Sequence, residues 1–252
     1  MKTMFAKVLM LMVLISLALG GTALAEKSYV NGIDANFPPF SFVNKQGEPD
    51  GFDIQAVNWI AEEMGFEVTH KPMAWDTIIP NLQAKKIDLI ASGMSITEER
   101  QKKVNFSTPY WTVDQVFVVP EGSELTVDDI LTGDVVLGAQ SGTPTADWLE
   151  AQVGEKENWN YDLRYYDSQP LAVTDLINGR IKAAAMDDVA AKDAARKKPL
   201  TILGTFGYKT EKFGYAVRKE DTELLKTLNA GLKKLMDDPY WDELIETYKP
   251  GH

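Results

Sequence analysis

The chain has 252 residues and is acidic, with 37 Asp and Glu against 26 Lys and Arg and a formal net charge of −11 at pH 7. Hydrophobic residues make up 44% and charged residues 25%, which is an ordinary globular composition and excludes collagen, coiled coil and wholesale disorder. The acidic balance argues against a nucleic-acid-binding protein, because phosphates require a basic surface. There is no cysteine, which excludes disulfides, thiol nucleophiles and thiolate metal sites. His70 and His252 are the only histidines, so we expect no metal site rich in histidine.

The first 25 residues have the pattern of a cleaved secretory signal. Lys2 and Lys7 give a positive start, residues 8–19 form an apolar run, and Ala23 and Ala25 form a small-x-small cleavage site. The alternative is a membrane anchor, but a spanning helix needs about 20 apolar residues. Cleavage would leave 252 − 25 = 227 residues, and we expect this mature protein to be periplasmic.

The rest of the chain alternates between strand and helix patterns. In the first half, the sequence predicts strands over 28–33, 66–71 and 87–91, and helices over 51–65, 77–86 and from Thr97 to Lys103. In the second half it predicts strands over 115–120, 135–139, 161–166, 183–186, 200–203 and 213–218. Helices are predicted from Thr143 onward and over 170–178, 188–198, 222–236 and 240–248. Such alternation predicts an α/β fold of mainly parallel sheets covered by helices.

In open α/β sheets the ligand lies beyond the carboxyl ends of the strands. The loops expected to carry function are therefore 34–42, 92–100 and 140–145, together with Asp187 at the end of a strand. No P-loop, G-x-G-x-x-G or G-x-S-x-G pattern appears in the chain, so we expect no cofactor and no catalytic residue.

Four segments, 51–65, 75–111, 137–149 and 176–188, carry a resemblance to a known family. In this order they resemble the periplasmic polar amino-acid-binding proteins of ATP-binding-cassette (ABC) importers, that is, solute-binding protein family 3 of the glutamine, lysine-arginine-ornithine and histidine type. The resemblance implies a type II fold, with lobe 1 formed by 26–112 plus 212–252 and lobe 2 by 113–211. Hinge strands near 110–114 and 208–214 would let the lobes close on the ligand.

The resemblance also implies how the ligand backbone is held. Arg100, in a T-x-x-R motif that begins at Thr97, would grip the α-carboxylate through two parallel hydrogen bonds. Asp187 would accept hydrogen bonds from the α-ammonium group, while Asp188 would cap the next helix. The loop residues Ser92, Gly93 and Ser95 would lie beside the same groups. For Ser95 the hydroxyl could either accept from the ammonium or donate to the carboxylate.

A helix N-terminus at Thr143 would add N–H donors for the carboxylate. Here the sequence departs from the family, because Pro144 has no N–H. Either the Thr143 hydroxyl compensates, or the carboxylate is held mainly by Arg100.

The side-chain pocket implied by the resemblance is lined by the aromatic rings of Phe37 and Phe52. Asp34 would lie at its far end and Gln140 at a variable position, and we expect Trp75, Met94 and Met186 as further lining residues. An acid at the far end favours glutamine, arginine, lysine, ornithine or histidine without choosing among them.

The function implied is capture of a free amino acid by a monomer and its delivery to an inner-membrane ABC permease. Two alternatives remain open. One is a periplasmic dehydratase on the same scaffold, similar to cyclohexadienyl dehydratase, which would need an acid placed for proton transfer. The other is the ligand-binding component of a sensory system.

Overall fold

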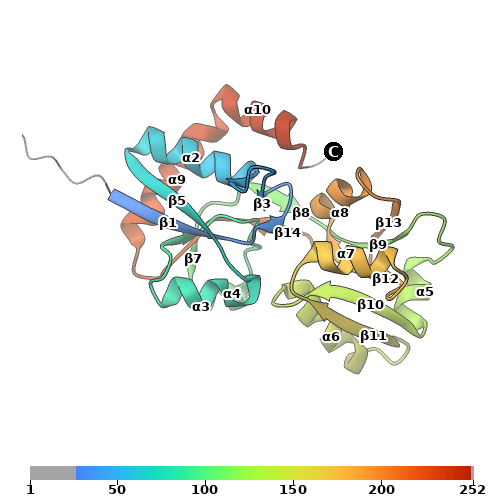
Figure 1. Cartoon of the computed structure of the whole chain (residues 1–252). Helices are drawn as coiled ribbons and strands as arrows, with labels where there is room; N and C mark the ends of the chain where they lie inside the picture. Colours follow the sequence, from blue (N-terminus) through green and yellow to red (C-terminus); the bar gives the residue numbers. More distant parts are fainter. Residues whose placement is uncertain (1–26, 251–252) are drawn as a thin grey trace, which may run out of the picture.

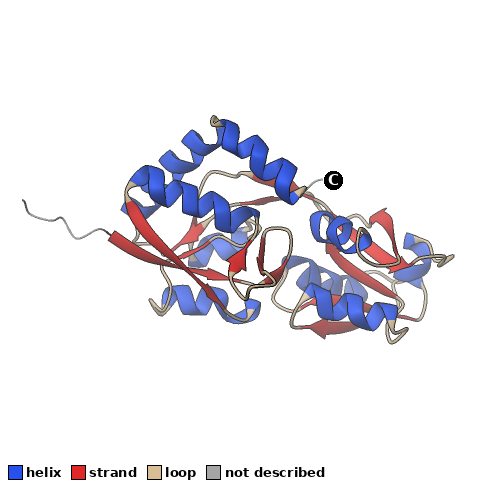
Figure 2. Ribbon diagram, turned by 45° about the horizontal axis from the view of Figure 1, so that its top comes forward, coloured by secondary structure: helices blue, strands red, loops and turns tan. Residues whose placement is uncertain are grey.

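The computed structural model describes residues 27–250, so the predicted signal at 1–25 lies outside the described residues. Within the described part, the elements gather into two lobes side by side (Figure 1). Each lobe is built on a five-stranded sheet with helices packed against it (Figure 2). No helix within 27–250 combines the length and apolar character needed to cross a membrane.

The first sheet has the strand order β5-β1-β6-β15-β7. These strands are β5 (Phe66–Pro72), β1 (Lys27–Ile33), β6 (Leu89–Ile90), β15 (Ala216–Val217) and β7 (Asn105–Phe106). The second sheet has the order β11-β10-β12-β9-β13. Its strands are β11 (Tyr161–Tyr166), β10 (Val135–Gln140), β12 (Ala183–Asp187), β9 (Gln115–Pro120) and β13 (Leu200–Thr205).

The two sheets share one pattern of strand direction. Three neighbouring strands run parallel in each, β5-β1-β6 and β11-β10-β12, and the remaining pairs are antiparallel. In each sheet four of the five strands therefore point the same way and one, β15 or β9, is reversed, so the sheets are mainly parallel as predicted. The reason for the reversed strand lies in the connections, because β15 returns to the first sheet from the other lobe and β9 enters the second sheet directly from the first lobe, without a crossover helix.

Helices cover the first sheet and complete its core. They are α2 (Phe52–Met64), η1 (Trp75–Thr77), α3 (Ile78–Gln83), α4 (Glu98–Lys103), α9 (Thr222–Met236) and α10 (Pro239–Tyr248). Helix α9 lies close to α2 at Gly231, where an added Cβ would come within 2.5 Å of Ile60. This close approach explains how a segment 231 − 60 = 171 positions away in sequence joins the core of the first lobe.

Four helices pack on the second sheet: α5 (Val127–Thr132), α6 (Pro144–Glu155), α7 (Gln169–Ile177) and α8 (Asp188–Ala195). The sequence prediction missed α5. Its first turn is fixed by a capping box in which the Thr126 hydroxyl accepts from the Asp129 N–H and the Asp129 carboxylate accepts from the Thr126 N–H. A small antiparallel sheet, β2 (Asn36–Phe37), β3 (Ser41–Val43) and β4 (Pro49–Asp50), replaces most of the loop predicted after β1.

Two strands cross between the lobes and pair with each other. They are β8 (Trp111–Val113) and β14 (Glu211–Phe213), with Glu211 opposite Val113 and Phe213 opposite Trp111. Both lie where hinge strands were expected, between the two sheets in Figure 1. The strand predicted over 213–218 is interrupted at Gly214 and Tyr215, because the chain leaves β14 there and enters the first sheet as β15.

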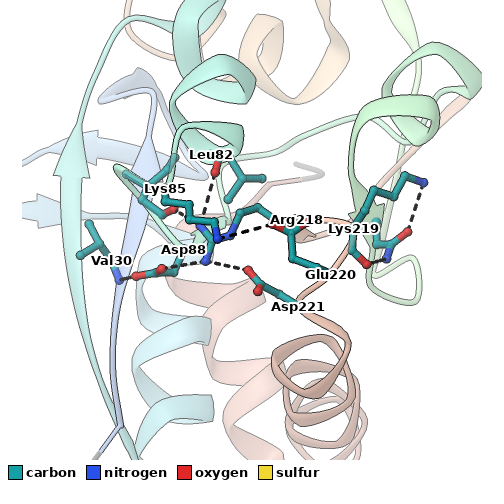
Figure 3. Close-up of polar contacts among 10 residues, drawn as sticks. Val30, Leu82, Lys85, Asp88, Arg218, Lys219, Glu220 and Asp221 are labelled. Atoms are coloured by element: carbon teal, nitrogen blue, oxygen red, sulfur yellow. Dashed lines mark hydrogen bonds and ion pairs between the residues drawn. The ribbon is translucent and has the colours of Figure 1, made fainter.

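A partly buried ion-pair cluster joins the returning chain to the first lobe (Figure 3). Arg218, directly after β15, pairs with Asp88 at 3.0 Å and with Asp221 at 2.6 Å. Its other terminal nitrogen donates to the carbonyl groups of Leu82 and Ile87. Because Arg218 itself is buried, loss of its acidic partners would leave a buried charge unpaired, so this cluster stabilises the first lobe.

Candidate functional site

A cavity lies between the two lobes and is lined from both sides. Its volume is about 30 Å³, so the lobes lie close together in this structure and leave less free space than small-molecule sites usually have. The lining residues are Asp34, Phe37, Trp75, Ser92, Gly93, Ser95, Arg100, Gln115, Gln140, Thr143, Pro144, Thr145, Gln169, Ala185, Met186, Asp187 and Glu211. Eleven of the thirteen predicted site residues are in this set, and only Phe52 and Met94 are outside it.

Arg100 reaches the cavity from α4. The Thr97 hydroxyl accepts from the Arg100 backbone N–H at 3.2 Å and so fixes the first turn of this short helix, as predicted. The guanidinium donates to the carbonyl of Ser95 at 3.0 Å and, across the lobes, to that of Gly142 at 3.2 Å. It also lies 5.3 Å from the ring centre of Trp75. These contacts hold a buried cation, 8% exposed, at the wall of the cavity.

Burial lowers the pKa of Arg100, while the charges of Glu211 and then Asp187 oppose that change. A guanidinium stays protonated in proteins, and its unused N–H groups remain available for an anion. The position therefore suits a carboxylate that enters the cavity.

Asp187 ends β12 on the opposite lobe. Its two carboxylate oxygens accept hydrogen bonds from the side-chain amides of Gln115 at 2.8 Å and Gln169 at 2.7 Å. Burial, reinforced by the charge of Glu211, raises the pKa of Asp187 to about 6. An approaching ammonium group would favour the ionised form of this acid.

Asp188 does not cap α8, so that prediction was wrong. It is the first residue of the helix, and the N-cap position belongs to Asp187. The Asp188 carboxylate instead accepts from the backbone N–H of Asp114 at 3.2 Å and pairs with Lys192. The acid thereby ties α8 to the segment that follows the hinge strand β8.

The loop after β6 is packed tightly against lobe 1. Gly93 has φ of +57°, and an added Cβ would lie 2.2 Å from the ring of Phe37, so only glycine fits there. Its N–H donates to the buried carboxylate of Asp53 at 2.6 Å. The hydroxyl of Ser92 accepts from the Asp34 N–H at 2.9 Å. The loop thus reaches the cavity on a backbone path fixed by its neighbours.

Asp34 and Gln140 meet across the lobes at one end of the cavity. The Gln140 amide donates to the Asp34 carboxylate at 2.9 Å and to the carbonyl of Asp167 at 3.3 Å. Burial raises the pKa of Asp34, and the hydrogen bond from Gln140 opposes the rise. This carboxylate also accepts from the Asn36 N–H at 2.9 Å, so it is engaged by two donors and still retains acceptor capacity.

The aromatic lining differs from the prediction. Phe37 and Trp75 line the cavity, but Phe52 does not. Phe52 is fully buried at the start of α2, where its ring packs edge-on against Trp111 and Trp241 at centroid distances of 5.7 and 4.9 Å. Met94 is also fully buried, in the apolar core beneath the first sheet. Both residues serve packing in lobe 1, and the expected Phe37–Phe52 pair is replaced by Phe37 and Trp75.

The N-terminus of α6 faces the cavity with Thr143, Pro144 and Thr145. Thr143 is the N-cap as predicted, but its hydroxyl donates to the carbonyl of Gln140 and accepts from the N–H of Ala146. The Thr143 hydroxyl has therefore no proton left to donate to a ligand carboxylate. The hydroxyl of Thr145 is buried without a hydrogen-bond partner among the described residues, so this side chain, unlike Thr143, is left for a ligand.

Sequence reasoning missed Gln115, Thr145, Gln169 and Glu211. Glu211 lies in the segment 208–214, which was expected only to connect the lobes. Gln115 begins β9 and Gln169 begins α7, and neither belongs to a recognisable motif. A signal for Glu211 was present, since an isolated acid on a strand between two lobes must lie near their junction.

Comparison with known proteins identifies the family. The profile of the bacterial extracellular solute-binding proteins, family 3, matches residues 29–251. The chain belongs to this family.

Individual relatives cover most of the chain. The L-cystine-binding protein TcyJ of Escherichia coli K12 is 33% identical over 220 residues, which are 86% of this chain and 80% of that protein. The lysine/arginine/ornithine-binding periplasmic protein of the same strain is 31% identical over 249 residues, 95% and 94% of the two chains. A crystal structure of the P235GK mutant of ArgBP from T. maritima has a TM-score of 0.77 at 36% identity and covers 88% of this chain and 94% of that chain.

These matches confirm the type II fold of the periplasmic binding proteins. All three relatives are binding proteins by name, which does not favour the dehydratase alternative. Their names differ in ligand, so family membership leaves the ligand of this chain open.

Proposed function

We propose that this protein captures a free polar or basic L-amino acid in the cavity between its lobes and delivers it to an ABC importer. The observation that carries the proposal is the placement of Arg100 and Asp187 on opposite lobes at one cavity. A zwitterion offers a carboxylate to the first and an ammonium group to the second. Family membership and the amino-acid ligands named for the relatives support the same function.

The energetics are sufficient without any chemical step. Micromolar binding corresponds to about −8 kcal/mol. Hydrogen bonds to charged groups contribute about 1.5–3 kcal/mol each, so two charged contacts and burial between Phe37 and Trp75 reach that range. Since the two charged partners belong to different lobes, ligand would stabilise the closed arrangement by its differential affinity. We infer that lobe 1 (26–112 plus 212–252) and lobe 2 (113–211) close about β8 and β14.

The proposed ligands are glutamine, arginine, lysine, ornithine and histidine. Asp34 supports this class, because its carboxylate lies at the cavity end where Gln140 already shows that a nitrogen donor fits. We further propose that residues 1–25 are a cleaved signal, that the mature protein works in the periplasm, and that it does so as a monomer.

A thermal-shift screen tests the proposal. The mature protein would be heated with each common L-amino acid and with ornithine. At about 100 times its Kd a ligand adds about 2.7 kcal/mol of stability, which raises the melting temperature by several degrees. Arg100→Ala is the matched control and should lose the shift. No shift with any amino acid would contradict the proposal.

A further inference from the structure

Glu211 lies where both lobes and the hinge meet. It begins the hinge strand β14 and is buried, with 4% of its surface exposed. One carboxylate oxygen accepts from the Ser95 hydroxyl of lobe 1 at 2.9 Å and from the Gln115 amide of lobe 2 at 3.4 Å. The other accepts from the Tyr208 hydroxyl at 3.1 Å. A single side chain thus joins the two lobes at the cavity wall.

The bond to Glu211 decides what Ser95 can do. A hydroxyl has one proton and two lone pairs. Because the Ser95 proton is directed to Glu211, only the lone pairs remain for a ligand. Of the two roles open to Ser95 from sequence, accepting from an ammonium group or donating to a carboxylate, this arrangement leaves the first.

The neighbouring amides are restricted in the same way. The Gln115 nitrogen donates to both Asp187 and Glu211, and the Gln169 nitrogen donates to Asp187. The Gln169 oxygen is buried and has no hydrogen-bond partner among the described residues. Ser95, Gln115 and Gln169 thus each direct a donor to one of the two acids, and the Gln169 oxygen and the Ser95 lone pairs are left as acceptors.

We propose that Glu211 is a positioning and specificity residue that makes this wall accept hydrogen bonds only. The inference rests on the proposed function and deepens it: the wall selects a ligand group with several N–H donors and a positive charge, which is an α-ammonium. An α-hydroxyl brings one donor and no charge, so it would leave buried acceptors without donors and the two carboxylates without a counter-charge. Sites built on such hydrogen bonds reject the analogue that lacks the donors. Since Glu211 contacts both lobes at once, the selective wall is complete only when they are closed.

The test compares an amino acid with the α-hydroxy acid of the same side chain. Calorimetry would measure L-arginine and its α-hydroxy counterpart, or the corresponding pair for whichever amino acid the thermal screen identifies. Glu211→Gln keeps the shape of the side chain, but its amide nitrogen can donate and allows Ser95 to reorient. We expect this variant to bind the amino acid about 10–100-fold more weakly, the equivalent of one charge-assisted hydrogen bond. The α-hydroxy acid should change by less than about threefold, so that the preference for the ammonium falls by at least about tenfold.

Two controls separate positioning from general damage. Tyr208→Phe removes a bond to Glu211 that does not involve Ser95, and it should leave the preference within about threefold of the parent. Ser95→Ala should lower the preference even if Glu211→Gln fails to fold. Equal losses for both ligands in Glu211→Gln, or an unchanged preference in Ser95→Ala, would overturn the inference. Failure of the parent protein to bind any amino acid would instead contradict the proposed function.

Discussion

The two walls of the cavity differ in chemistry although they are built alike. Lobe 1 supplies the guanidinium of Arg100 and the rings of Phe37 and Trp75, whereas lobe 2 supplies Asp187 with the amides of Gln115 and Gln169. In the proposed function, one wall would donate to an anion and cover apolar surface, and the other would accept from a cation. The charged partners for the two ends of a zwitterion would then come from different lobes, Arg100 from lobe 1 and Asp187 from lobe 2, while Ser95 of lobe 1 would add an uncharged acceptor for the ammonium group. The difference teaches that the ligand-binding energy is fully available only when the lobes meet.

The similarity in construction has a simple origin. Asp34 follows β1 and the loop 92–95 follows β6, while Gln140 ends β10 and Asp187 ends β12. Each lobe thus presents polar groups at the carboxyl ends of its parallel strands. The carboxyl ends of the parallel strands in each sheet therefore supply one half of the candidate site.

The largest effect is expected from removing the cation of lobe 1. Arg100→Ala should weaken amino-acid binding by more than about 100-fold, because the ligand carboxylate would be buried without its charged partner. Lys102→Ala, on the exposed side of the same helix, is the matched control and should bind like the parent. Isothermal calorimetry would measure both. Affinity retained within about threefold in Arg100→Ala would contradict the assigned role.

The acid wall should make binding depend on pH. The pKa of Asp187 in the free protein is raised to about 6, and an ammonium group binds its ionised form. Below that pH the proton must leave before ligand binds, so affinity should fall by up to about tenfold per pH unit and level off above about pH 7. Calorimetry in buffers of different ionisation enthalpy would also detect the released proton.

Asp187→Asn provides the comparison for this pH dependence. The variant should bind more weakly at neutral pH and lose most of the slope. A parent protein whose affinity is constant between about pH 4.5 and 8 would show that the acid wall does not contact the ammonium.

The aromatic residues distinguish cavity from core. Trp75→Ala should weaken ligand binding about tenfold, through loss of ring contact with the ligand and with Arg100. Phe52→Ala should leave affinity nearly unchanged but lower the free energy of unfolding by about 3–5 kcal/mol, because it opens a cavity in the core. Chemical denaturation and calorimetry on both variants separate the effects, and the reverse result would restore Phe52 to the site.

The smallest change is expected at the far end of the cavity. Asp34→Asn should weaken basic amino acids several-fold more than glutamine, since only the former lose a charge partner. Competition calorimetry with arginine and glutamine would measure the ratio. Equal losses for both ligands would mean that Asp34 does not contact a side-chain cation.

Much of the fold follows from local pattern. Strand β9 and the helices α9 and α10 have nearly the predicted bounds, because each has a clear hydrophobic period and end signals. Helix α5 was missed although Thr126 and Asp129 form a readable capping box. The break at Gly214 could not be read from the sequence, because it depends on which lobe each half of the segment joins.

The site was predictable where a residue belongs to a motif with a fixed place in the fold. Arg100 follows the N-cap Thr97, and Asp187 ends a buried strand. The local structure of each residue was therefore enough to predict that it lines the cavity. Phe52 and Trp75 both lie near the start of a helix. Local sequence does not show that Phe52 packs against Trp241 in the core while Trp75 lines the cavity. Glu211 becomes part of the site through pairing of β14 with β8, a contact almost 100 positions apart in sequence.

The central claim is that one ligand is held at both charged ends by partners from separate lobes. Titrating the parent protein with an amino acid, its decarboxylated amine and its des-amino acid tests this directly. We predict that each single-charge analogue binds at least about 100-fold more weakly than the amino acid itself, since each leaves one buried charge unpaired. An analogue that binds within about threefold of the amino acid would contradict the two-ended grip.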